Sequence, residues 1–252
     1  SAPLARSPRR SGPPRGPSAE LLCVGTELLA GKLNTHAAYL SARLRSEGFD
    51  VRREATLPDR LEEVSAAVAE ALSRSDAVLL CGGLGPTFDD LTREAAADAL
   101  GRALRYRPSL YARIRRQYRR FRRRIPSSNR RQAWVIEGAR ILPNPRGSAP
   151  GQFLSLRSPS GPKSLALLPG PGSEMKPMFE RQALPRLLRR HRSCGARARA
   201  STVLRLYGIA ESAADMLLAP LTRRPPAWGE YTILAGLGLV DLHITVRARS
   251  AA

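Results

Sequence analysis

The sequence lacks the patterns that identify a zinc protein, a disulfide-rich domain or a membrane-spanning helix. Its three cysteines and three histidines form no CxxC or Cys/His cluster, so we expect no zinc site. Cys23 and Cys81 lie within apolar stretches and are interpreted as small buried hydrophobic residues, which suits a reducing cytosol. Apolar runs are far shorter than the roughly 20 residues of a membrane helix, and the N-terminus has no apolar signal-peptide core. We therefore expect a cytoplasmic protein with no membrane partner.

Lysine is also scarce, although the chain is strongly basic. Only Lys32, Lys163 and Lys176 occur among 42 basic residues, and the formal net charge is +21. Thirteen arginines and no acid fall within residues 102–131, and four more arginines fall within residues 1–19. Such a bias can arise from genome base composition as well as from selection for binding. The positive charge is local, and a nucleic-acid partner is possible but not favoured.

The 252 residues suit one sizeable domain with a smaller one. Residues 1–18 are rich in Pro, Arg, Ser and Gly, and we expect a disordered basic tail. Residues 19–192 alternate strand and helix patterns, which predicts an α/β domain with a mostly parallel sheet and helices on both faces. Residues 200–252 predict a small α+β domain, which we interpret as a packing or dimerising module. A homo-oligomer is expected.

The predicted elements follow from apolar periodicity and from Gly, Pro and Ser positions. Strands are expected at 20–25, 51–57 and 77–81, with a hairpin of 152–156 and 164–168 around Ser158–Lys163. The helices carry apolar residues at helical spacing, including Ala37, Leu40 and Leu44 in one and Val64, Val68, Ala71 and Leu72 in the next. Further helices are expected at 91–100, at 108–125 and from Ser173 to about 190.

The most informative stretch is a glycine-rich loop that follows the strand at 77–81. Gly82, Gly83 and Gly85 let the backbone turn and let a ligand approach closely, and Asp89 and Asp90 precede a helix. Strand, glycine loop and helix N-terminus together form a phosphate-binding geometry, and adjacent carboxylates are ligands for a hard divalent cation. The alternative interpretation is a tight turn in which an Asp caps the helix.

Two other loops have a comparable position. Residues 25–27 (Gly-Thr-Glu) follow the first strand, and residues 169–172 (Pro-Gly-Pro-Gly) precede a helix that we expect Ser173 to cap. Because ligands bind beyond the carboxyl ends of parallel strands, the loops at 25–27 and 82–90 are expected to converge. On its own the Pro-Gly-Pro-Gly sequence predicts only a turn.

The arginine-rich segment 108–125 predicts a helix with one apolar side and one basic side. Three interpretations stay open: a solvated face in an arginine-rich chain, an electrostatic funnel for a polyanionic small substrate, and a nucleic-acid or membrane surface. Like charges one turn apart cost helix stability, so a nearby anion would favour this helix.

Six motifs in order over residues 20–180 resemble the N-terminal region of CinA, the competence/damage-inducible protein A family. They are Val24–Leu29, then Gly31 with Asn34-Thr35, then Gly82–Thr92, Asn129–Ala133, Leu142–Gly151 and Leu168–Met178. The resemblance implies a three-layer α/β/α fold similar to molybdopterin-binding proteins of the MogA and MoeA type, followed by a small KH-type domain. His36, Ser128, Arg131 and Gly172 depart from the family pattern, which puts the choice of substrate in doubt.

The resemblance also implies a nucleotide site. CinA-like core domains are associated with metal-dependent hydrolysis of ADP-ribose, and related domains with hydrolysis of FAD. Full-length CinA carries a nicotinamide-mononucleotide deamidase motif that this sequence does not contain, so deamidase activity is not expected of it. We expect a metal-dependent nucleotide pyrophosphatase acting on ADP-ribose or a similar dinucleotide. The alternatives are a non-catalytic molybdopterin- or nucleotide-binding protein and a nucleic-acid-binding accessory.

The resemblance assigns residues to this chemistry. Asp89, Asp90 and Glu27 are the expected catalytic residues and would hold Mg²⁺, Mn²⁺ or Co²⁺. The expected substrate-binding residues are Gly25, Thr26, Asn34, Gly82, Gly83, Gly85, Pro86, Thr87, Thr92, Asn129, Arg130, Gln132, Asn144, Gly147, Gly170, Pro171, Ser173 and Glu174. No histidine lies in the motifs, so a carboxylate or metal-bound hydroxide would act as base.

Overall fold

The computed structural model describes residues 16–120, 122, 124–191, 199–223, 229–236 and 238–247. The chain divides into two compact units, Pro17–Ala196 and Arg197–Ala252. Of the tail expected at residues 1–18, residues 1–15 lie outside the described part, and Ser18 is not in a tail. Ser18 begins the first strand, where its amide and hydroxyl donate to Asp76 Oδ2 at 2.7 and 2.8 Å. The strand therefore begins two residues earlier than its sequence suggested.

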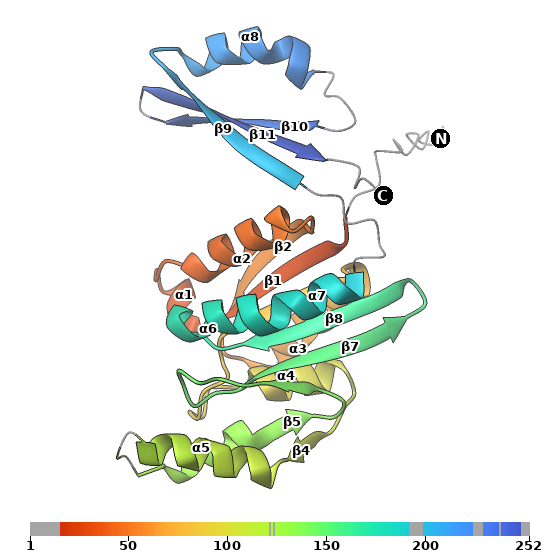
Figure 1. Ribbon diagram of the computed structural model, residues 1–252, viewed down its shortest axis with the longest axis vertical. Helices are drawn as coiled ribbons and strands as arrows, with labels where there is room; N and C mark the ends of the chain where they lie inside the picture. Colours follow the sequence, from red (N-terminus) through yellow and green to blue (C-terminus); the bar gives the residue numbers. More distant parts are fainter. Residues whose placement is uncertain are drawn as a thin grey trace, which may run out of the picture. The chain divides into compact units, whose positions relative to one another are not determined.

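The larger unit is built on a six-stranded sheet in the order β2-β1-β3-β8-β7-β6 (Figure 1). Its strands are β1 (Ser18–Val24), β2 (Asp50–Leu57), β3 (Ala77–Cys81), β6 (Arg140–Leu142), β7 (Gly151–Ser158) and β8 (Gly161–Leu168). Strand β7 is antiparallel to both its neighbours, and the other adjacent pairs are parallel. The mostly parallel sheet is thus confirmed, and the hairpin β7–β8 has a shorter turn than expected.

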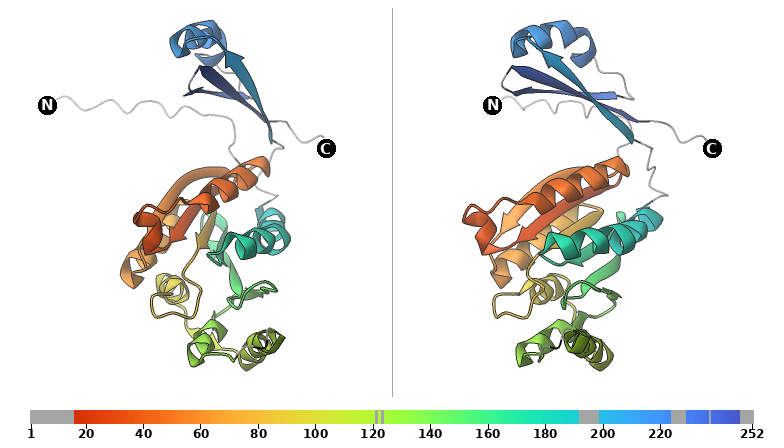
Figure 2. Two further views of the ribbon diagram at one scale, coloured as in Figure 1. Left: turned by 90° about the vertical axis from the view of Figure 1, so that its left-hand side faces the viewer. Right: turned by 60° about the vertical axis from the view of Figure 1, so that its left-hand side comes forward.

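Helices cover both faces of this sheet, which makes the three layers that the resemblance implied (Figures 1 and 2). One face carries α2 (Thr35–Ser46), α6 (Gly172–Met178) and α7 (Leu184–His191), which η2 (Phe179–Ala183) joins to α6. The other face carries α3 (Leu61–Arg74) and α4 (Thr92–Ala99), while α1 (Thr26–Leu29) is a single turn after β1. Strands β1 and β3 are buried along their whole length, which explains the continuous apolar sequence of β3.

A buried lysine fastens α3 to the sheet. Lys163 on β8 is 8% exposed, and its Nζ donates to the carbonyls of Leu72, Ser73 and Ser75 at 2.5, 3.4 and 3.0 Å. Carbonyls at a helix C-terminus have no partner within the helix and carry partial negative charge. The ammonium group therefore satisfies the buried carbonyls of Leu72 and Ser75 and adds a longer contact to that of Ser73.

The arginine-rich segment forms a small subdomain with its own apolar cluster. It contains β4 (Leu104–Tyr106), α5 (Pro108–Arg120), the 3₁₀ helix η1 (Ser127–Ala133) and β5 (Trp134–Ile136). Leu110 and Ile114 on α5 are buried against Ala133 and Val135, whereas Arg115 and Arg116 are exposed. The two-sided helix is confirmed, but α5 ends at Arg120 rather than near residue 125.

The smaller unit contains β9 (Arg199–Tyr207), α8 (Glu211–Thr222), β10 (Gly229–Gly236) and β11 (Leu239–Arg247). Its three strands form an antiparallel sheet in the order β10-β11-β9. Residues 192–198, between the two domains expected from the sequence, lie outside the described residues. Helix α8 exposes Met216 and Leu217. Within the described residues of both units, no helix has the length and apolar character needed to cross a bilayer.

Candidate functional site

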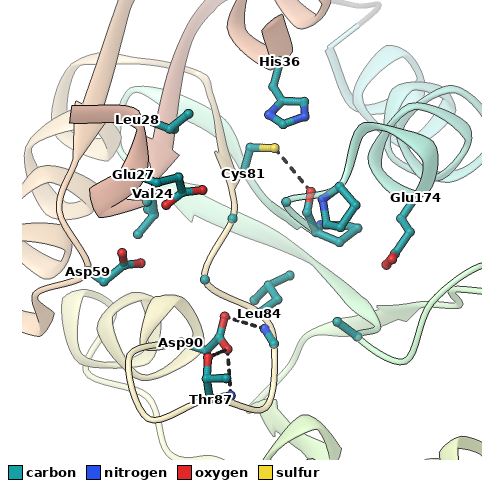
Figure 3. A pocket seen from close by; sticks show the side chains of 18 of the residues that line it. Val24, Glu27, Leu28, His36, Asp59, Cys81, Leu84, Thr87, Asp90 and Glu174 are labelled. Atoms are coloured by element: carbon teal, nitrogen blue, oxygen red, sulfur yellow. Dashed lines mark hydrogen bonds between the residues drawn. The ribbon is translucent and has the colours of Figure 1, made fainter. Parts of the chain in front are cut away.

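A cavity of about 660 Å³ lies beyond the carboxyl ends of the parallel strands. Loops that follow β1, β2, β3, β6 and β8 all contribute to its wall, among them residues 82–90 and 169–172. The chain passes from β1 to β2 on one side and then to β3 on the other, so the cavity lies at a topological switch point, where α/β sheets bind ligands. In the view of Figure 3, Glu27 and Asp59 lie to its left and Glu174 to its right.

Asp90 organises the glycine loop after β3. Its Oδ1 accepts the Gly85 amide at 2.7 Å, and its Oδ2 accepts both the Thr87 amide at 2.8 Å and the Thr87 hydroxyl. The dashed lines in Figure 3 mark these contacts. The expected Asp cap of the following helix is wrong, because α4 begins after Leu91 and has no side-chain cap. The carboxylate bonds back to its own loop instead.

The glycines of this loop are required by close backbone contacts. Gly82 has a φ of +106°, and a Cβ there would lie 2.1 Å from the carbonyl oxygen of Val24. Gly83 has a φ of +62°, and its Cβ would lie 2.2 Å from Thr92 Oγ1. Both conformations favour glycine. Thr92 is fully buried, so it supports the loop from behind and does not line the cavity.

Two arginines that the sequence analysis did not select hold the same loop. Arg93 is fully buried, and its Nη1 donates to the carbonyl of Leu84 at 2.7 Å. Burial lowers the pKa of Arg93, which nearby Glu94 opposes. Arg131 donates to the carbonyls of Thr87 and Asp90 and pairs with Glu94 at 3.1 Å. The loop is thus braced at its amides by Asp90 and at its carbonyls by arginine.

Asp59 and Thr26 join the ends of β1 and β2 beside the cavity. The Thr26 amide and hydroxyl donate to Asp59 Oδ2 at 2.7 and 2.9 Å, and the Asp59 amide donates back to Thr26 Oγ1 at 3.2 Å. Asp59 lines the cavity but is not among the site residues expected from the sequence. Its position directly after the β2 strand pattern is the signal that could have identified it.

The wall opposite Glu27 depends on Asn144. Its Nδ2 donates to Glu174 Oε2 at 2.6 Å and to the carbonyl of Ala149 at 2.8 Å, while its Oδ1 accepts the amides of Arg146 and Gly147. Asn144 therefore positions the loop after β6 and does not itself reach the cavity. Helix α6 begins after Pro171 without a side-chain cap, so the expected Ser173 cap is wrong.

Residues 129–132 divide between support and cavity wall. Asn129 is buried and donates from Nδ2 to Tyr118 Oη at 2.9 Å and to Gln132 Oε1 at 2.8 Å. Arg130 is exposed, with its guanidinium 5.0 Å from the ring centroid of Tyr106. Gln132 lines the cavity, and its buried Nε2 has no hydrogen-bond partner among the described residues. A buried donor of this kind calls for a ligand or an ordered water.

The structure places most of the expected residues at the cavity and the rest behind or beside it. Those that line it are Gly25, Glu27, Gly82, Gly83, Gly85, Pro86, Thr87, Asp89, Asp90, Gln132, Gly170, Pro171 and Glu174. Those that do not are Thr26, Asn34, Thr92, Asn129, Arg130, Asn144, Gly147 and Ser173. Asn34 caps α2 by accepting the Ala37 amide at 3.2 Å.

The cavity also contains His36 and Lys32, which the sequence analysis did not assign to the site. Burial lowers the pKa of His36, the charges of Lys32 and Lys176 lower it further, and Glu27 partly opposes them. The imidazole is therefore neutral at pH 7 and able to accept a proton. Lys32 Nζ lies 3.5 Å from Glu27 Oε1, in a pair that is more than half exposed and contributes little to stability.

The carboxylates of the cavity do not form a protein cage for a metal ion. Among the described residues, no three His, Cys, Asp or Glu side chains are grouped to hold one. Both oxygens of Asp90 already accept hydrogen bonds from the loop. Asp89 is exposed at the cavity wall. These side chains suit Mg²⁺ only if the ion binds one or two of their carboxylates and takes further ligands from the phosphates of a substrate.

Comparison with known proteins identifies the family. Residues 20–189 match the model of a probable molybdopterin-binding domain. The chain is 44% identical over 237 residues to a protein of Symbiobacterium thermophilum described as competence-damage inducible, covering 92% of this chain and 53% of that protein. A CinA-like protein of Deinococcus radiodurans is 41% identical over 236 residues, covering 93% and 56%. The chain thus spans about half the length of these relatives.

A solved structure supports the same assignment. The crystal structure of a CinA protein from Thermoplasma acidophilum is 32% identical, with a TM-score of 0.61, and the match covers 68% of this chain and 98% of that one. The matched family domain contains the six-stranded sheet and the whole cavity lining. The chain therefore belongs to the molybdopterin-binding domain family and, within it, to the CinA-like proteins.

Proposed function

We propose that the cavity binds a nucleotide with a pyrophosphate group, of the ADP-ribose type, and that the protein hydrolyses its phosphoanhydride bond with the help of a divalent cation. The observation that carries the proposal is Gln132, a fully buried side chain whose Nε2 donor at the cavity wall has no partner in the described structure. A bound polar ligand would satisfy this donor, and leaving it unpaired costs about 1–3 kcal/mol.

Backbone amides supply the phosphate contacts in this proposal. The loop amides of Gly83 and Leu84 donate to no other group in the described part of the chain, whereas those of Gly85 and Thr87 are bonded to Asp90. A Cβ on Gly170 would lie 3.6 Å from the Cα of Gly82, so the two glycine loops adjoin. Two adjoining loops without side chains let a pyrophosphate approach the backbone.

A cation would be held jointly by the substrate phosphates and by Asp89 and Glu27. When bound, it would neutralise the pyrophosphate and lower the pKa of an attacking water. Asp90 would keep the loop in its binding shape. Among the groups at the cavity wall, neutral His36 and the Glu27 carboxylate can take the proton of the water. His36 is an addition to the expected residues, because the sequence motifs contained no histidine.

Incubation of the purified protein with ADP-ribose and Mg²⁺, Mn²⁺ or Co²⁺ tests the activity. The expected product is AMP, measured by chromatography, with loss of AMP formation on chelation of the metal. The variant Gln132→Glu keeps the acceptor for Asn129 but replaces the free donor with an anion. It should retain its thermal transition and lose the stabilisation by ADP-ribose. Unchanged ligand stabilisation in this variant would overturn the placement of the site.

A second candidate is a binding protein without hydrolytic activity. The observation in its favour is that both carboxylate oxygens of Asp90 are occupied by the loop, which removes that residue from direct chemistry. Stabilisation by a nucleotide or molybdopterin without any AMP formation would select this candidate.

The cytosolic setting stays part of the proposal, consistent with the buried free thiols of Cys23 and Cys81. The expected homo-oligomer stays a prediction for size-exclusion chromatography.

A further inference from the structure

A second hollow, of about 510 Å³, lies elsewhere in the larger unit and shares no residue with the candidate site. We call it the arginine cavity. Arg140, Arg186, Arg189 and Arg190 line it, with Phe153 and Ser155 of β7. Arg140 begins β6, and Pro162, near the start of β8, also lines it. The arginine cavity thus lies toward the amino ends of these strands, whereas the candidate site lies beyond their carboxyl ends.

The positive charge of the arginine cavity is not balanced by any acidic side chain that lines it. No carboxylate lines it, and none of its four arginines forms an ion pair with any acid in the described ranges. Arg140, Arg186 and Arg189 line the same cavity. Burial lowers the pKa of Arg186, and the charges of Arg140 and Arg189 lower it further. Repulsion of this kind destabilises the folded chain unless an anion offsets it.

Two of the arginines are held in place by carbonyl groups. Arg190 donates from Nε to the carbonyl of Lys163 at 3.0 Å and from Nη2 to that of Leu156. Arg186 donates from Nη1 to the carbonyl of Gln182 at 2.5 Å, and its buried Nε has no partner among the described residues. Arg140 and Arg189 are exposed and donate to no described group. The site therefore combines two fixed guanidinium groups with two that are free to close on a ligand.

The positions of Arg189 and Arg190 at the C-terminus of α7 explain only part of this arrangement. Basic residues in the last turn of a helix interact favourably with its dipole, which suits Arg189 and Arg190. It does not explain Arg140, which belongs to β6 and lines the same cavity. One guanidinium group can bind two phosphate oxygens at once. Several guanidinium groups around one cavity therefore complement the several negative charges of a phosphate chain.

We propose that the arginine cavity binds a compact oligophosphate, either inorganic or carried by a nucleotide. The test titrates inorganic tripolyphosphate and, in parallel, ATP into the full chain at constant ionic strength, with binding measured by calorimetry. The site variant is Arg140→Gln/Arg189→Gln, because neither side chain has a structural hydrogen bond. The control Arg115→Gln/Arg116→Gln removes the same charge from exposed positions of α5.

We expect tripolyphosphate to bind the wild-type chain and the control, with affinity reduced about tenfold or more in Arg140→Gln/Arg189→Gln. If ATP binds the wild type and its affinity falls equally in Arg140→Gln/Arg189→Gln, the site also accepts phosphates carried by a nucleotide. If tripolyphosphate binds and ATP does not, the site accepts free phosphate chains. Gln132→Glu, in the candidate site, should leave this binding intact. Absence of binding to the wild type, equal losses in the two double variants, or loss in Gln132→Glu would each overturn the proposal.

Discussion

The carboxylate of Asp90 accepts the backbone amide of Gly85 at a distance of 2.7 Å, five residues back along the chain. Together with the contacts to Thr87, this bond closes the glycine loop on itself. Hydrogen bonds between a charged group and backbone amides are worth about 1.5–3 kcal/mol each. The shape of the loop therefore depends on a residue that the sequence assigns to metal binding.

Asp90→Asn should lower the free energy of unfolding by about 1.5–3 kcal/mol, because the amide nitrogen cannot accept one of these bonds. The matched control is Asp89→Asn, which removes the same charge from an exposed neighbour with no described partner and should change stability by less than about 0.5 kcal/mol. Urea denaturation measures both. Equal effects in the two variants would contradict the bracing role of Asp90.

Gly82→Ala should destabilise the fold by about 3 kcal/mol or more, since its φ is +106° and the new Cβ would press on the Val24 carbonyl. Gly101→Ala provides the comparison. Gly101 also has a positive φ, +59°, but nothing lies within 4 Å of its Cβ position. Only backbone strain of about 1–2 kcal/mol applies there. Thermal or urea unfolding that ranks the two in the opposite order would show that the close approach at Gly82 is not real.

Arg74→Met should destabilise the fold more than the loss of an exposed ion pair does, because it leaves the carboxylate of Glu20, at 2% exposure, with the Ser75 hydroxyl as its remaining described donor. Arg60→Met removes an exposed pair with Glu63 and should cost less than about 1 kcal/mol. Burial raises the pKa of Glu20, but hydrogen bonds from Arg74 and Ser75 and the charge of Arg74 outweigh it, so the pKa lies below 4.5.

The pH dependence of this pair follows from the sign of that shift. The stabilisation is fully present above pH 4.5 and is lost as the pH falls through the lowered pKa of Glu20. Acid titration of the wild type and of Glu20→Gln, followed by circular dichroism, measures it. The same acid slope in both proteins would show that Glu20 does not contribute.

His191 should make the fold weaken at mildly acidic pH. Burial lowers the pKa of its imidazole below 6.5, Asp76 opposes this shift, and Arg190 adds to it. Its Nε2 lies 3.0 Å from Ser164 Oγ, and its buried Nδ1 has no partner in the described structure. The unfolded imidazole binds a proton from about pH 6.5 downward, whereas the buried one binds it only at a lower pH, so stability falls as the pH drops from 6.5 toward the lowered pKa.

Urea denaturation at pH 7.5 and pH 5.5 tests the role of His191. The wild type should lose stability at pH 5.5, and His191→Gln should lose less. His36→Asn serves as the control, since it removes the half-buried imidazole of the candidate cavity and leaves His191 in place. An unchanged pH effect in His191→Gln would place the titrating group elsewhere.

The sheet and its helices could be predicted because burial leaves a direct trace in the sequence. Val78 and Leu80 face one apolar cluster while Leu79 faces the other, which requires the unbroken apolar run of β3. The order of the strands leaves no such trace. Asp59 follows β2, and only the placement of β2 beside β1 brings it to Thr26 and the cavity.

The direction in which each polar side chain points is the other feature that could not be predicted from the sequence. Asn129 and Asn144 belong to motifs that do form the site, yet each points into the protein and supports a neighbour. Arg93 follows Thr92 within α4 and its sequence gives no sign that it is buried. Polar residues that brace a loop and polar residues that contact a ligand have the same composition, and only their hydrogen bonds distinguish them.

The scarcity of lysine, together with the burial of Lys163, gives the molecule an unusual surface chemistry. Lys163 is enclosed by the carbonyls at the end of α3, which leaves Lys32 and Lys176 as the only exposed lysines of the chain. Lys32 lines the candidate cavity, and the charge of Lys176 acts on His36 in the same wall. A reagent that labels side-chain amines is therefore expected to react at or near the cavity. A fluorophore attached in this way could report on ligand binding there without any substitution in the sequence.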